Sequence, residues 1–300
     1  MLPIADYDYE LPPERIAQTP LEPRDHSRLL VLDRASGALT HLHFYDVVRY
    51  LNAGDVLVVN DSRVLPARLY GRKATGGRSE VLLLRQLDNL RWLALVKGKV
   101  HVGSSLTFGD NAVHVTATVE QLDADGSRVI RFEQRVNELL PQIGVMPTPP
   151  YITHTLNNPE RYQTVYSANV GSAAAPTAGL HWTPELIERT KAMGVQWCNV
   201  TLHVGLDTFR PVQVDNALDH QMHSEWYEFP AATAAAINDA KANGKRVIAV
   251  GTTSVRVLES VARKFGDQAL TDDSGWTDIF IYPPYDFKLV DRLITNFHLP

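Results

Sequence analysis

The sequence predicts an α/β protein whose main domain is interrupted by an inserted all-β barrel domain. Strand–helix–strand units follow Tyr151, and a buried strand at Asp55–Asn60 belongs to the same pattern. Between them the chain changes to short β-rich runs separated by Gly, Asn and Asp. At 300 residues the chain also exceeds the usual single domain. We therefore predict a discontinuous α/β domain of residues 1–60 and 151–300, with a largely parallel or mixed sheet, and a barrel domain of residues 61–150.

The N-terminal region predicts an arm, a hairpin and one buried strand. Residues 6–27 are rich in Pro and charge, which favours an extended surface arm. Residues 28–33 and 38–43 are β-rich runs joined by a turn, as in a β-hairpin. A short helical turn is expected at 45–51, and residues 55–60 (DVLVVN) are apolar on both faces, as a central strand requires.

The β-rich block contains six short runs, and their even spacing is typical of a small barrel. Within this block only residues 136–140 resemble a helix, and the proline-rich stretch at 146–150 predicts a stiff linker at the boundary. The expected strands cover residues 64–72, 79–85, 91–96, 105–108, 113–121 and 128–132.

The remainder of the chain predicts three helices and four strands of a sheet with covering helices. Each helix is followed by a turn residue or by a new apolar run. The expected helices are residues 184–193, 231–242 and 252–265, and the expected strands are 195–204, 245–250, 276–282 and 289–296.

Composition limits the function classes. The content of 44% hydrophobic and 21% charged residues is that of an ordinary soluble globular protein, and no run approaches the roughly 18 apolar residues of a membrane span. The acidic, Pro-containing N-terminus is unlike a secretory signal. The single cysteine, Cys198, excludes an internal disulfide and favours a cytoplasmic location. The net charge of −5 means that a nucleic-acid partner has to use a local basic patch.

A run of small residues before a helix is the first candidate site. Residues 173–183 (AAAPTAGLHWT) contain Thr177, Gly179 and His181, and Thr183 and Pro184 predict an N-cap and a first helical position. Small side chains let the backbone approach a ligand closely, and a helix N-terminus presents unpaired N–H groups. The same residues also suit an ordinary loop.

A glycine turn after a buried strand is the second candidate. Residues 247–260 (VIAVGTTSVRVLES) predict a strand, a turn at Gly251, and a helix that starts at Thr252 and Thr253 with Arg256 one turn further. This order suits an anion or nucleotide at the carboxyl edge of a sheet. The stretch lacks the GxGxxG and P-loop patterns, so a standard dinucleotide or triphosphate site is not expected. The alternative is a helix that is merely well capped.

The end of the strand at 195–204 is the third candidate. Ligands bind at strand ends in α/β sheets, although a core histidine with a structural partner is an equal alternative for His203. The candidate residues here are His203, Gly205, Asp207, Thr208 and Arg210.

Two further groups of polar residues have competing interpretations. His220, His223 and Glu225 offer two imidazoles and a carboxylate, but without a third ligand motif we predict no metal and favour Glu225 as a charged partner for a substrate. The basic residues of the first part of the β-rich block suit either a solvated barrel face or a phosphate-binding patch. They are Arg63, Arg68, Arg72 and Lys73, and the even spacing of Arg68 and Arg72 puts them on one strand face.

Long motifs extend along nearly the whole chain. They are YDYELPP (7–13), PRDHSRLLVLDR (23–34), GDVLVVNDSRVLPARLYGRK (54–73), AAPTAGLHWTPEL (174–186), LHVGLDTFRPV (202–212), MHSEWYE (222–228), VIAVGTTSVRVLES (247–260) and TDIFIYPPYDFKLVDRLITNFHLP (277–300). With these motifs the chain resembles the S-adenosylmethionine:tRNA ribosyltransferase-isomerases, the QueA family of queuosine biosynthesis. The resemblance implies an α/β domain with an inserted β-barrel.

The reaction that the resemblance implies uses S-adenosylmethionine as a ribosyl donor. The acceptor is the aminomethyl-deazaguanine wobble base of tRNA, and the products are epoxyqueuosine-tRNA, adenine and methionine. S-adenosylmethionine is thus a consumed co-substrate, and no cofactor is expected. The protein has to supply an acid, a base and a holder for the methionine carboxylate and amine.

Roles for the candidate residues follow from this chemistry as hypotheses. His181 and His203 are the acid–base candidates because imidazole titrates near neutrality. Arg256 and the Thr252–Thr253 turn are expected to hold the carboxylate. Glu225 and Asp207 are expected to pair with the sulfonium or the amine, and the remaining small and polar candidates to line the substrate site.

Partners and rival functions complete these expectations. We expect tRNA and S-adenosylmethionine as partners, no membrane, and a monomer. The family continues beyond NFHLP into a further helix and a C-terminal segment, so we expect that part to be absent from this chain. A non-catalytic RNA-binding protein and a zinc hydrolase at His220, His223 and Glu225 are the two alternatives.

Overall fold

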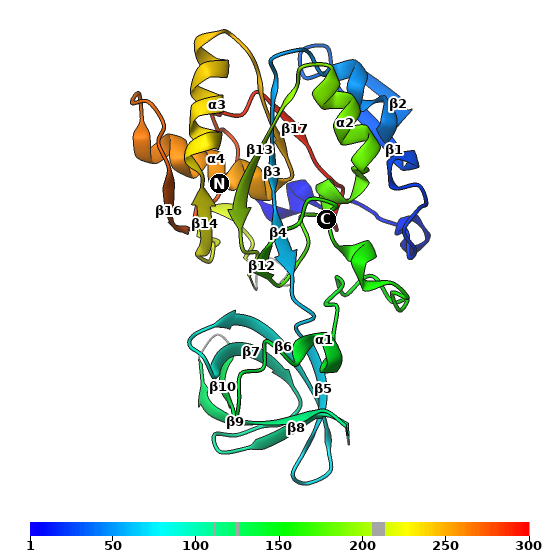
Figure 1. The fold of residues 1–300 in the computed structure, drawn as a ribbon, viewed down its shortest axis with the longest axis vertical. Helices are drawn as coiled ribbons and strands as arrows, with labels where there is room; N and C mark the ends of the chain where they lie inside the picture. Colours follow the sequence, from blue (N-terminus) through cyan, green and yellow to red (C-terminus); the bar gives the residue numbers. More distant parts are fainter. Residues whose placement is uncertain (111, 124–125, 206–213, 300) are drawn as a thin grey trace. The chain divides into compact units, whose positions relative to one another are not determined.

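The computed structural model describes residues 1–300 except 111, 124–125, 206–213 and 300. The chain forms two compact units (Figure 1). The first unit comprises residues 1–63, 150–169 and 175–300, and the second comprises residues 64–149 and 170–174. Among the described residues, no helix is long and apolar enough to cross a membrane.

The first unit is built on a six-stranded mixed sheet in the order β16-β14-β13-β3-β15-β17. The middle strand β3 pairs in parallel with β13 on one side and β15 on the other, and β15 pairs in parallel with β17. The strands β14 and β16 continue the sheet in antiparallel order. The bounds are β3 Val56–Asn60, β13 Gln196–Leu202, β14 Glu225–Phe229, β15 Val247–Val250, β16 Asp273–Thr277 and β17 Arg292–Ile294.

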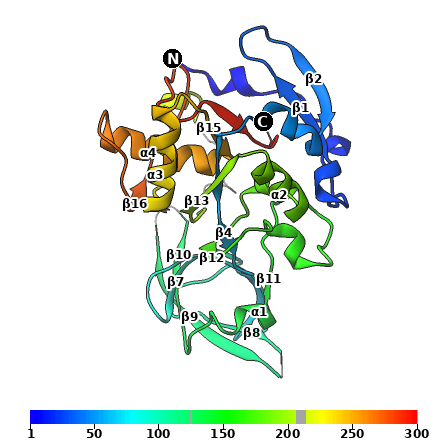
Figure 2. The same ribbon diagram turned by 45° about the horizontal axis from the view of Figure 1, so that its top comes forward.

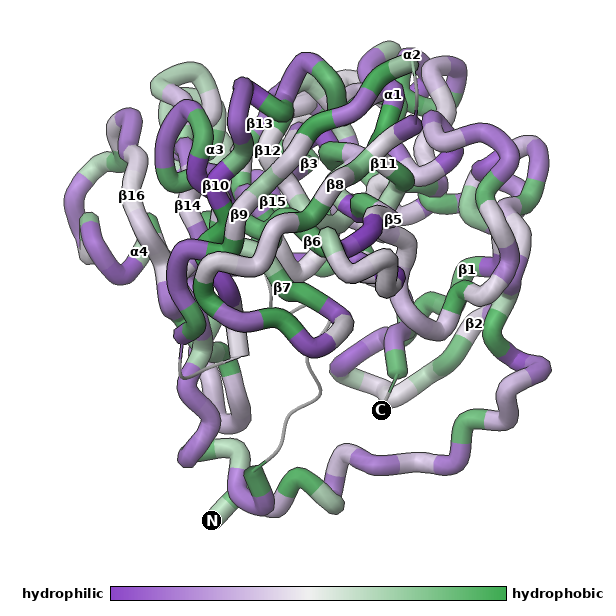
Figure 3. Tube along the Cα trace, turned by 90° about the horizontal axis from the view of Figure 1, so that it is seen from below, coloured by the Kyte–Doolittle hydropathy of each residue, from purple (hydrophilic) through white to green (hydrophobic). Residues whose placement is uncertain are grey.

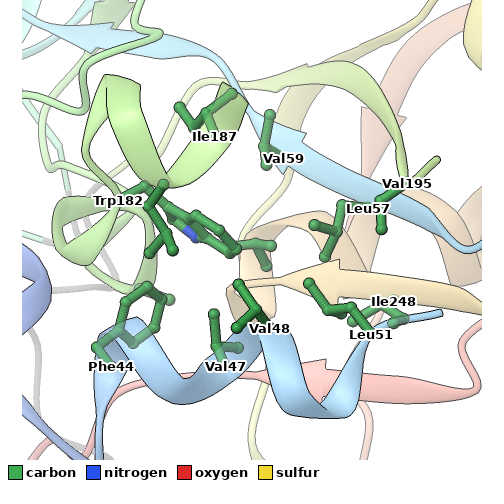
Figure 4. Packing of buried hydrophobic residues seen from close by; sticks show 13 residues of the cluster. Phe44, Val47, Val48, Leu51, Leu57, Val59, Trp182, Ile187, Val195 and Ile248 are labelled. Carbon is green, nitrogen blue, oxygen red and sulfur yellow. The ribbon is translucent and has the colours of Figure 1, made fainter. Parts of the chain in front are cut away.

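Helices cover both faces of this sheet, and β3 is therefore buried along its whole length. Leu57 and Val59 pack on one face with the 3-10 helix η4 (Phe44–Tyr50) and with α2 (Pro184–Ala192). Figure 4 shows Trp182 within this cluster, near Phe44 of η4 and Ile187 of α2. The helices α3 (Ala231–Ala242) and α4 (Thr252–Phe265) pack against β3, β13 and β15 on the opposite face, apart from α2 (Figure 2).

Smaller elements complete the first unit. The predicted hairpin is confirmed as β1 (Arg28–Leu32) and β2 (Leu39–His43). Short strands β4 (Ser62–Val64) and β12 (Asn169–Ser172) pair where the chain passes between the units. The remaining 3-10 helices are η1 Ile4–Tyr7, η2 Pro13–Arg15, η3 Arg24–His26, η5 Pro159–Tyr162, η6 Thr177–His181 and η8 Ala217–Asp219.

The second unit is a closed antiparallel barrel of six strands in the order β5-β6-β7-β10-β9-β8. Pairing of β5 with β8 closes it, and β11 (Gly144–Val145) adds to β5. Alternation of buried and exposed residues along the strands separates a filled interior from an outer face, and hydropathy changes along the barrel strands in Figure 3. The bounds are β5 Arg68–Lys73, β6 Arg78–Gln86, β7 Arg91–Lys97, β8 Ser105–Gly109, β9 His114–Leu122 and β10 Arg128–Phe132.

Three elements differ from the sequence prediction. The helix expected at 136–140 is instead the single turn α1 (Leu140–Ile143). The strand expected at 276–282 lies at 273–277, because β16 pairs with β14, a strand that the sequence analysis did not predict. The strand β17 is shorter than the predicted 289–296, since only Arg292–Ile294 pairs with β15.

Candidate functional site

The candidate site lies at the carboxyl edge of the four parallel strands. Asp61 follows β3, His203 follows β13, Gly251 follows β15 and Asn296 follows β17. Parallel strands place their carboxyl ends at one edge, where ligands of open α/β sheets bind.

His203 follows β13 with its ring largely buried. Its backbone N–H donates to the Trp226 carbonyl at 3.0 Å, which fixes the chain beside β14. The ring Nδ1 is buried and has no hydrogen-bond partner among the described residues. Burial lowers the pKa of His203, and the charges of Glu228 and Asp61 oppose that shift. The imidazole is therefore neutral at neutral pH, and its Nδ1 is not used by any group in the described part of the chain.

His181 is held through both ring nitrogens. Its Nε2 lies 2.8 Å from the Asn296 Oδ1, and its Nδ1 lies 2.8 Å from the Ser27 hydroxyl. A carboxamide oxygen can only accept, so Nε2 carries the proton and Nδ1 accepts from Ser27. Burial is the main cause that lowers the pKa of His181. With both nitrogens engaged, His181 is better suited to fixing structure at this edge than to moving a proton.

The segment that carries His181 lies beside the Gly251 turn. The predicted N-cap is confirmed, because the Thr183 hydroxyl accepts from the Leu186 N–H at 3.2 Å. Before it, residues 177–181 form the 3-10 helix η6. A Cβ built at Gly251 would lie 3.8 Å from the Ala178 Cβ, so the two candidate segments are neighbours.

Glycine occupies two positions of the site for different structural reasons. Gly251 has φ +89° and ψ 152°, a conformation that essentially only glycine adopts. Gly179 has no such backbone, but a side chain there would collide with the Tyr166 hydroxyl and the Thr164 side chain. Gly179 thus allows close packing of η6 on the segment before β12.

The N-terminus of α4 has no side-chain cap. The helix starts at Thr252, after Gly251, and its first turn contains no acidic residue. The Thr253 hydroxyl is buried and has no partner in the described part of the chain. Unpaired N–H groups and the helix dipole make such an end suitable for an anion.

Glu225 and Arg256 form a buried ion pair. Glu225 at the start of β14 is 6% exposed in its side chain and Arg256 on α4 is 13% exposed. The other carboxylate oxygen of Glu225 accepts from the Gly205 N–H at 2.8 Å. Arg256 and Glu225 therefore pair with each other. The sequence had predicted instead that Arg256 binds a substrate carboxylate and that Glu225 pairs with a substrate cation.

Other predicted residues lie apart from this edge or outside the described residues. Asp207, Thr208 and Arg210 belong to the stretch 206–213, which lies outside them. His220 packs its ring against Phe280, and no cluster of three or more metal-ligating side chains is found in the described ranges. The zinc interpretation of His220, His223 and Glu225 therefore has no geometric support there.

The predicted basic residues divide between the two units. Arg63 belongs to the first unit, where it contacts Glu160 and, at 3.0 Å, the Ser167 hydroxyl. Arg68, Arg72 and Lys73 lie on β5 of the barrel. Arg68 is 3.5 Å from Glu80, whereas Arg72 lies directly opposite Arg78 of β6.

Asp61 is a residue of this edge that the sequence analysis did not select. It lies at the end of the central strand and is 6% exposed. Its Oδ1 accepts from the Thr201 hydroxyl at 2.7 Å and from the Asn169 amide at 3.1 Å. The only local signal was the position of a carboxylate directly after a fully apolar strand.

Stability should fall on mild acidification because burial lowers the pKa of His181, His203 and His298. In the unfolded chain each of these imidazoles binds a proton near pH 6.5, whereas in the folded chain it does so only at lower pH. The unfolded state then binds more protons in this window, so the free energy of unfolding decreases as pH falls below about 6.5. Thermal unfolding at pH 7.5 and 5.5 should show the lower Tm at pH 5.5.

A glutamine at position 203 is the matched test of that pH effect. The His203→Gln variant should show a smaller drop in Tm between pH 7.5 and 5.5 than the unaltered chain. The exposed carboxyl of Asp88, whose pKa backbone hydrogen bonds lower to about 2, titrates well below this window. An equal drop in both proteins would contradict the assignment to His203.

The structure thus defines an α/β protein of two units, with a mixed sheet in one and a closed β-barrel in the other. Polar side chains lie at the carboxyl edge of its parallel strands, where open α/β sheets generally bind ligands. Sequence comparison then identifies the family. The chain belongs to the queuosine biosynthesis protein family, whose profile matches residues 4–300.

Two curated relatives and one solved structure extend this result. The S-adenosylmethionine:tRNA ribosyltransferase-isomerases of Staphylococcus aureus strains JH9 and Mu3 are each 51% identical over 302 residues, covering 99% of this chain and 87% of theirs. The crystal structure of S-adenosylmethionine tRNA ribosyltransferase from Thermotoga maritima is 39% identical, with a TM-score of 0.52, and the match covers 98% of this chain and 85% of that one. The resemblance found in the sequence motifs is thereby confirmed.

Proposed function

We propose that this chain transfers and isomerises the ribosyl unit of S-adenosylmethionine onto the aminomethyl-deazaguanine wobble base of tRNA, with release of adenine and methionine. The observation that carries the proposal is the neutral imidazole of His203 at the carboxyl edge of the sheet, whose buried Nδ1 has no hydrogen-bond partner among the described residues. The curated relatives at 51% identity, which are named for ribosyl transfer to tRNA, support the substrates.

His203 is the general base in this proposal. The sulfonium makes the neighbouring 5′ C–H of the ribose acidic, and a neutral imidazole near its own pKa is the usual acceptor for such a proton. The sugar then rearranges with loss of adenine, and the tRNA amine is alkylated. Ring closure to the epoxide expels methionine. His181 holds the adjacent segment through Ser27 and Asn296.

The start of α4 holds the methionine carboxylate. Its uncapped N–H groups and the Thr253 hydroxyl offer donors, and the helix dipole favours the negative charge. Arg256 supports this arrangement indirectly, because its pair with Glu225 fixes α4 against β14. Thr177, Gly179 and Gly205 belong to the segments that border the same edge, and no cofactor is required.

Adenine release from S-adenosylmethionine, with and without precursor-bearing tRNA, tests the function. Release that depends on the tRNA is the expected result, together with ribosyl transfer into the tRNA. Methyl transfer, or no turnover in the full-length protein, would overturn the proposal.

The barrel, which we propose to be a domain inserted into the α/β domain, contributes to tRNA binding. Tyr70, 54% exposed, lies between Arg68 and Arg72 on the outer face of β5. An exposed aromatic ring among basic side chains suits stacking on an unpaired base beside phosphate contacts. The opposed Arg72 and Arg78 repel each other, a cost that a bound phosphate removes.

Reversing the charge of Arg72 should weaken tRNA binding. The Arg72→Glu variant is expected to reduce the slope of log K against log salt by about 1, as for the loss of one phosphate contact. Binding measured over a series of salt concentrations checks this. The Arg131→Glu variant alters an exposed arginine of β10 in the same barrel and is the matched control. An unchanged slope for Arg72→Glu would remove this face of β5 from the proposal.

The monomeric state and the cytoplasmic location stay predictions.

A further inference from the structure

Four carboxylates in the described part of the chain are buried: Asp55, Asp61, Glu225 and Glu259. Three of them are compensated. Asp55 pairs with Arg246, and Glu225 pairs with Arg256. Glu259 accepts from three consecutive backbone N–H groups, those of residues 288–290, and from the Tyr285 hydroxyl.

Asp61 is the exception. It is 6% exposed, and no cationic side chain pairs with it in the described ranges. The nearby Arg63 is directed to Glu160 and Ser167. The two donors to Asp61, Thr201 and Asn169, are neutral and both contact Oδ1, so Oδ2 has no donor among the described residues. Burying a carboxylate without a cation is unfavourable. Folds retain such unfavourable features mainly where they serve a ligand.

The surroundings of Asp61 point to the ligand side of the sheet. Its charge raises the pKa of His203 and that of the Tyr166 hydroxyl, so all three lie within electrostatic reach of one another. The Tyr166 hydroxyl and the His203 Nδ1 are both buried and have no hydrogen-bond partner among the residues that the structure describes. A negative charge and these two polar atoms therefore gather near the carboxyl ends of β3 and β13.

We propose that Asp61 binds a cationic group of S-adenosylmethionine, either its sulfonium or its α-ammonium. This inference rests on the proposed function. Hydrogen bonds from Thr201 and Asn169 hold Oδ1 in place. Oδ2, which has no donor among the described residues, then faces the bound cation, and this cation supplies the counter-charge that the described residues do not provide. Asp61 takes the role that the sequence predicted for Glu225 and Asp207. Arg256 already neutralises the charge of Glu225, and Asp207 lies outside the described residues.

Calorimetric binding of three ligands to the Asp61→Asn variant tests the proposal. S-adenosylmethionine carries both cations, S-adenosylhomocysteine only the ammonium, and 5′-methylthioadenosine neither. An affinity loss of tenfold or more for S-adenosylmethionine alone assigns Asp61 to the sulfonium. The same loss for S-adenosylmethionine and S-adenosylhomocysteine, with 5′-methylthioadenosine unchanged, assigns it to the ammonium.

Other outcomes overturn the inference. Unchanged affinity for S-adenosylmethionine refutes it, including the case in which only the KM for tRNA rises, because the cation would then belong to the tRNA base. Equal losses for all three ligands also refute it, since they indicate general damage. If the unaltered protein itself fails to bind S-adenosylmethionine, the proposed function fails first, and the two failures are thus distinguishable.

The Asp55→Asn variant is the matched control, because Asp55 directly precedes the same strand β3 and has its own cation. Without ligand, Asp61→Asn should have a Tm equal to or above that of the unaltered chain, since an uncompensated buried charge is removed. Asp55→Asn should lower the Tm and leave the affinity for S-adenosylmethionine unchanged. A lowered Tm for Asp61→Asn with unchanged affinity would make Asp61 a structural residue.

Discussion

Replacing His203 with alanine should lower the rate of tRNA-dependent adenine release by about 10²–10⁴-fold, the usual contribution of a general base. The expectation follows from the buried Nδ1, which has no partner in the described structure, and from the lowered pKa that keeps the ring neutral. Single-turnover assays at saturating S-adenosylmethionine separate this loss of chemistry from a loss of binding. Because burial lowers the pKa of His203, the rate in the unaltered enzyme should fall only on acidification to a pH below the ordinary imidazole pKa of about 6.5. The residual activity of His203→Ala should lack that dependence.

Two comparisons sharpen this test. His41→Ala removes an exposed imidazole of β2 and should leave adenine release unchanged. Both ring nitrogens of His181 contact protein groups, so we expect this histidine to hold structure and not to move a proton. The Asn296→Ala variant removes the contact to Nε2 and should therefore reduce the rate less than His203→Ala does. Near-normal turnover in His203→Ala would move the base to another residue.

Replacing Glu225 with alanine should lower the free energy of unfolding of the first unit by about 3–5 kcal/mol, because it leaves the buried Arg256 without its counter-charge. The same change removes the acceptor of the Gly205 N–H and so loosens the chain after β13. Urea unfolding followed by tryptophan fluorescence measures this effect, since only Trp92 of the five tryptophans belongs to the barrel unit.

The double variant Glu225→Ala with Arg256→Ala should lose less stability than the sum of the two single variants, because neither charge is left alone. The exposed pair of Asp88 and Arg91 is the surface control, and Asp88→Ala should change stability much less than Glu225→Ala does. A loss in Glu225→Ala as small as that in Asp88→Ala would mean that water reaches Arg256.

Local patterns predicted most of the secondary structure. The helix α3 (Ala231–Ala242) has the predicted bounds, since alanine-rich helix composition ends at Asn243 and Gly244. The helix α4 begins at Thr252 after Gly251 as expected. The strand β14 was missed because its polar residues were interpreted as a ligand cluster. Its strand character depends on pairing with β13 and β16, which no local window contains.

The site was only partly accessible from the sequence for the same reason. His181, His203 and the Gly251 turn could be predicted as candidates because they lie at strand ends and helix starts. The pairing of Glu225 with Arg256 joins residues 31 positions apart, and the contact of Asp61 with Thr201 joins residues 140 positions apart. Asp61 lies within a stretch of basic residues that drew attention to phosphate binding, so its burial was visible only in three dimensions.

The central position of β3 also bears on how the chain is made on the ribosome. This apolar strand is synthesised early, but its partner β13 follows about 140 residues later. At roughly 5–20 residues per second, the strand waits about 7–28 seconds for that partner. The barrel strands β5 to β10 all emerge within this interval, and in the described part of the chain they pair only among themselves or with β11. Nascent chains halted before residue 196 should therefore contain a folded barrel and a β3 segment that has no strand partner. Such an exposed apolar segment is prone to aggregation and is the kind of surface that chaperones bind.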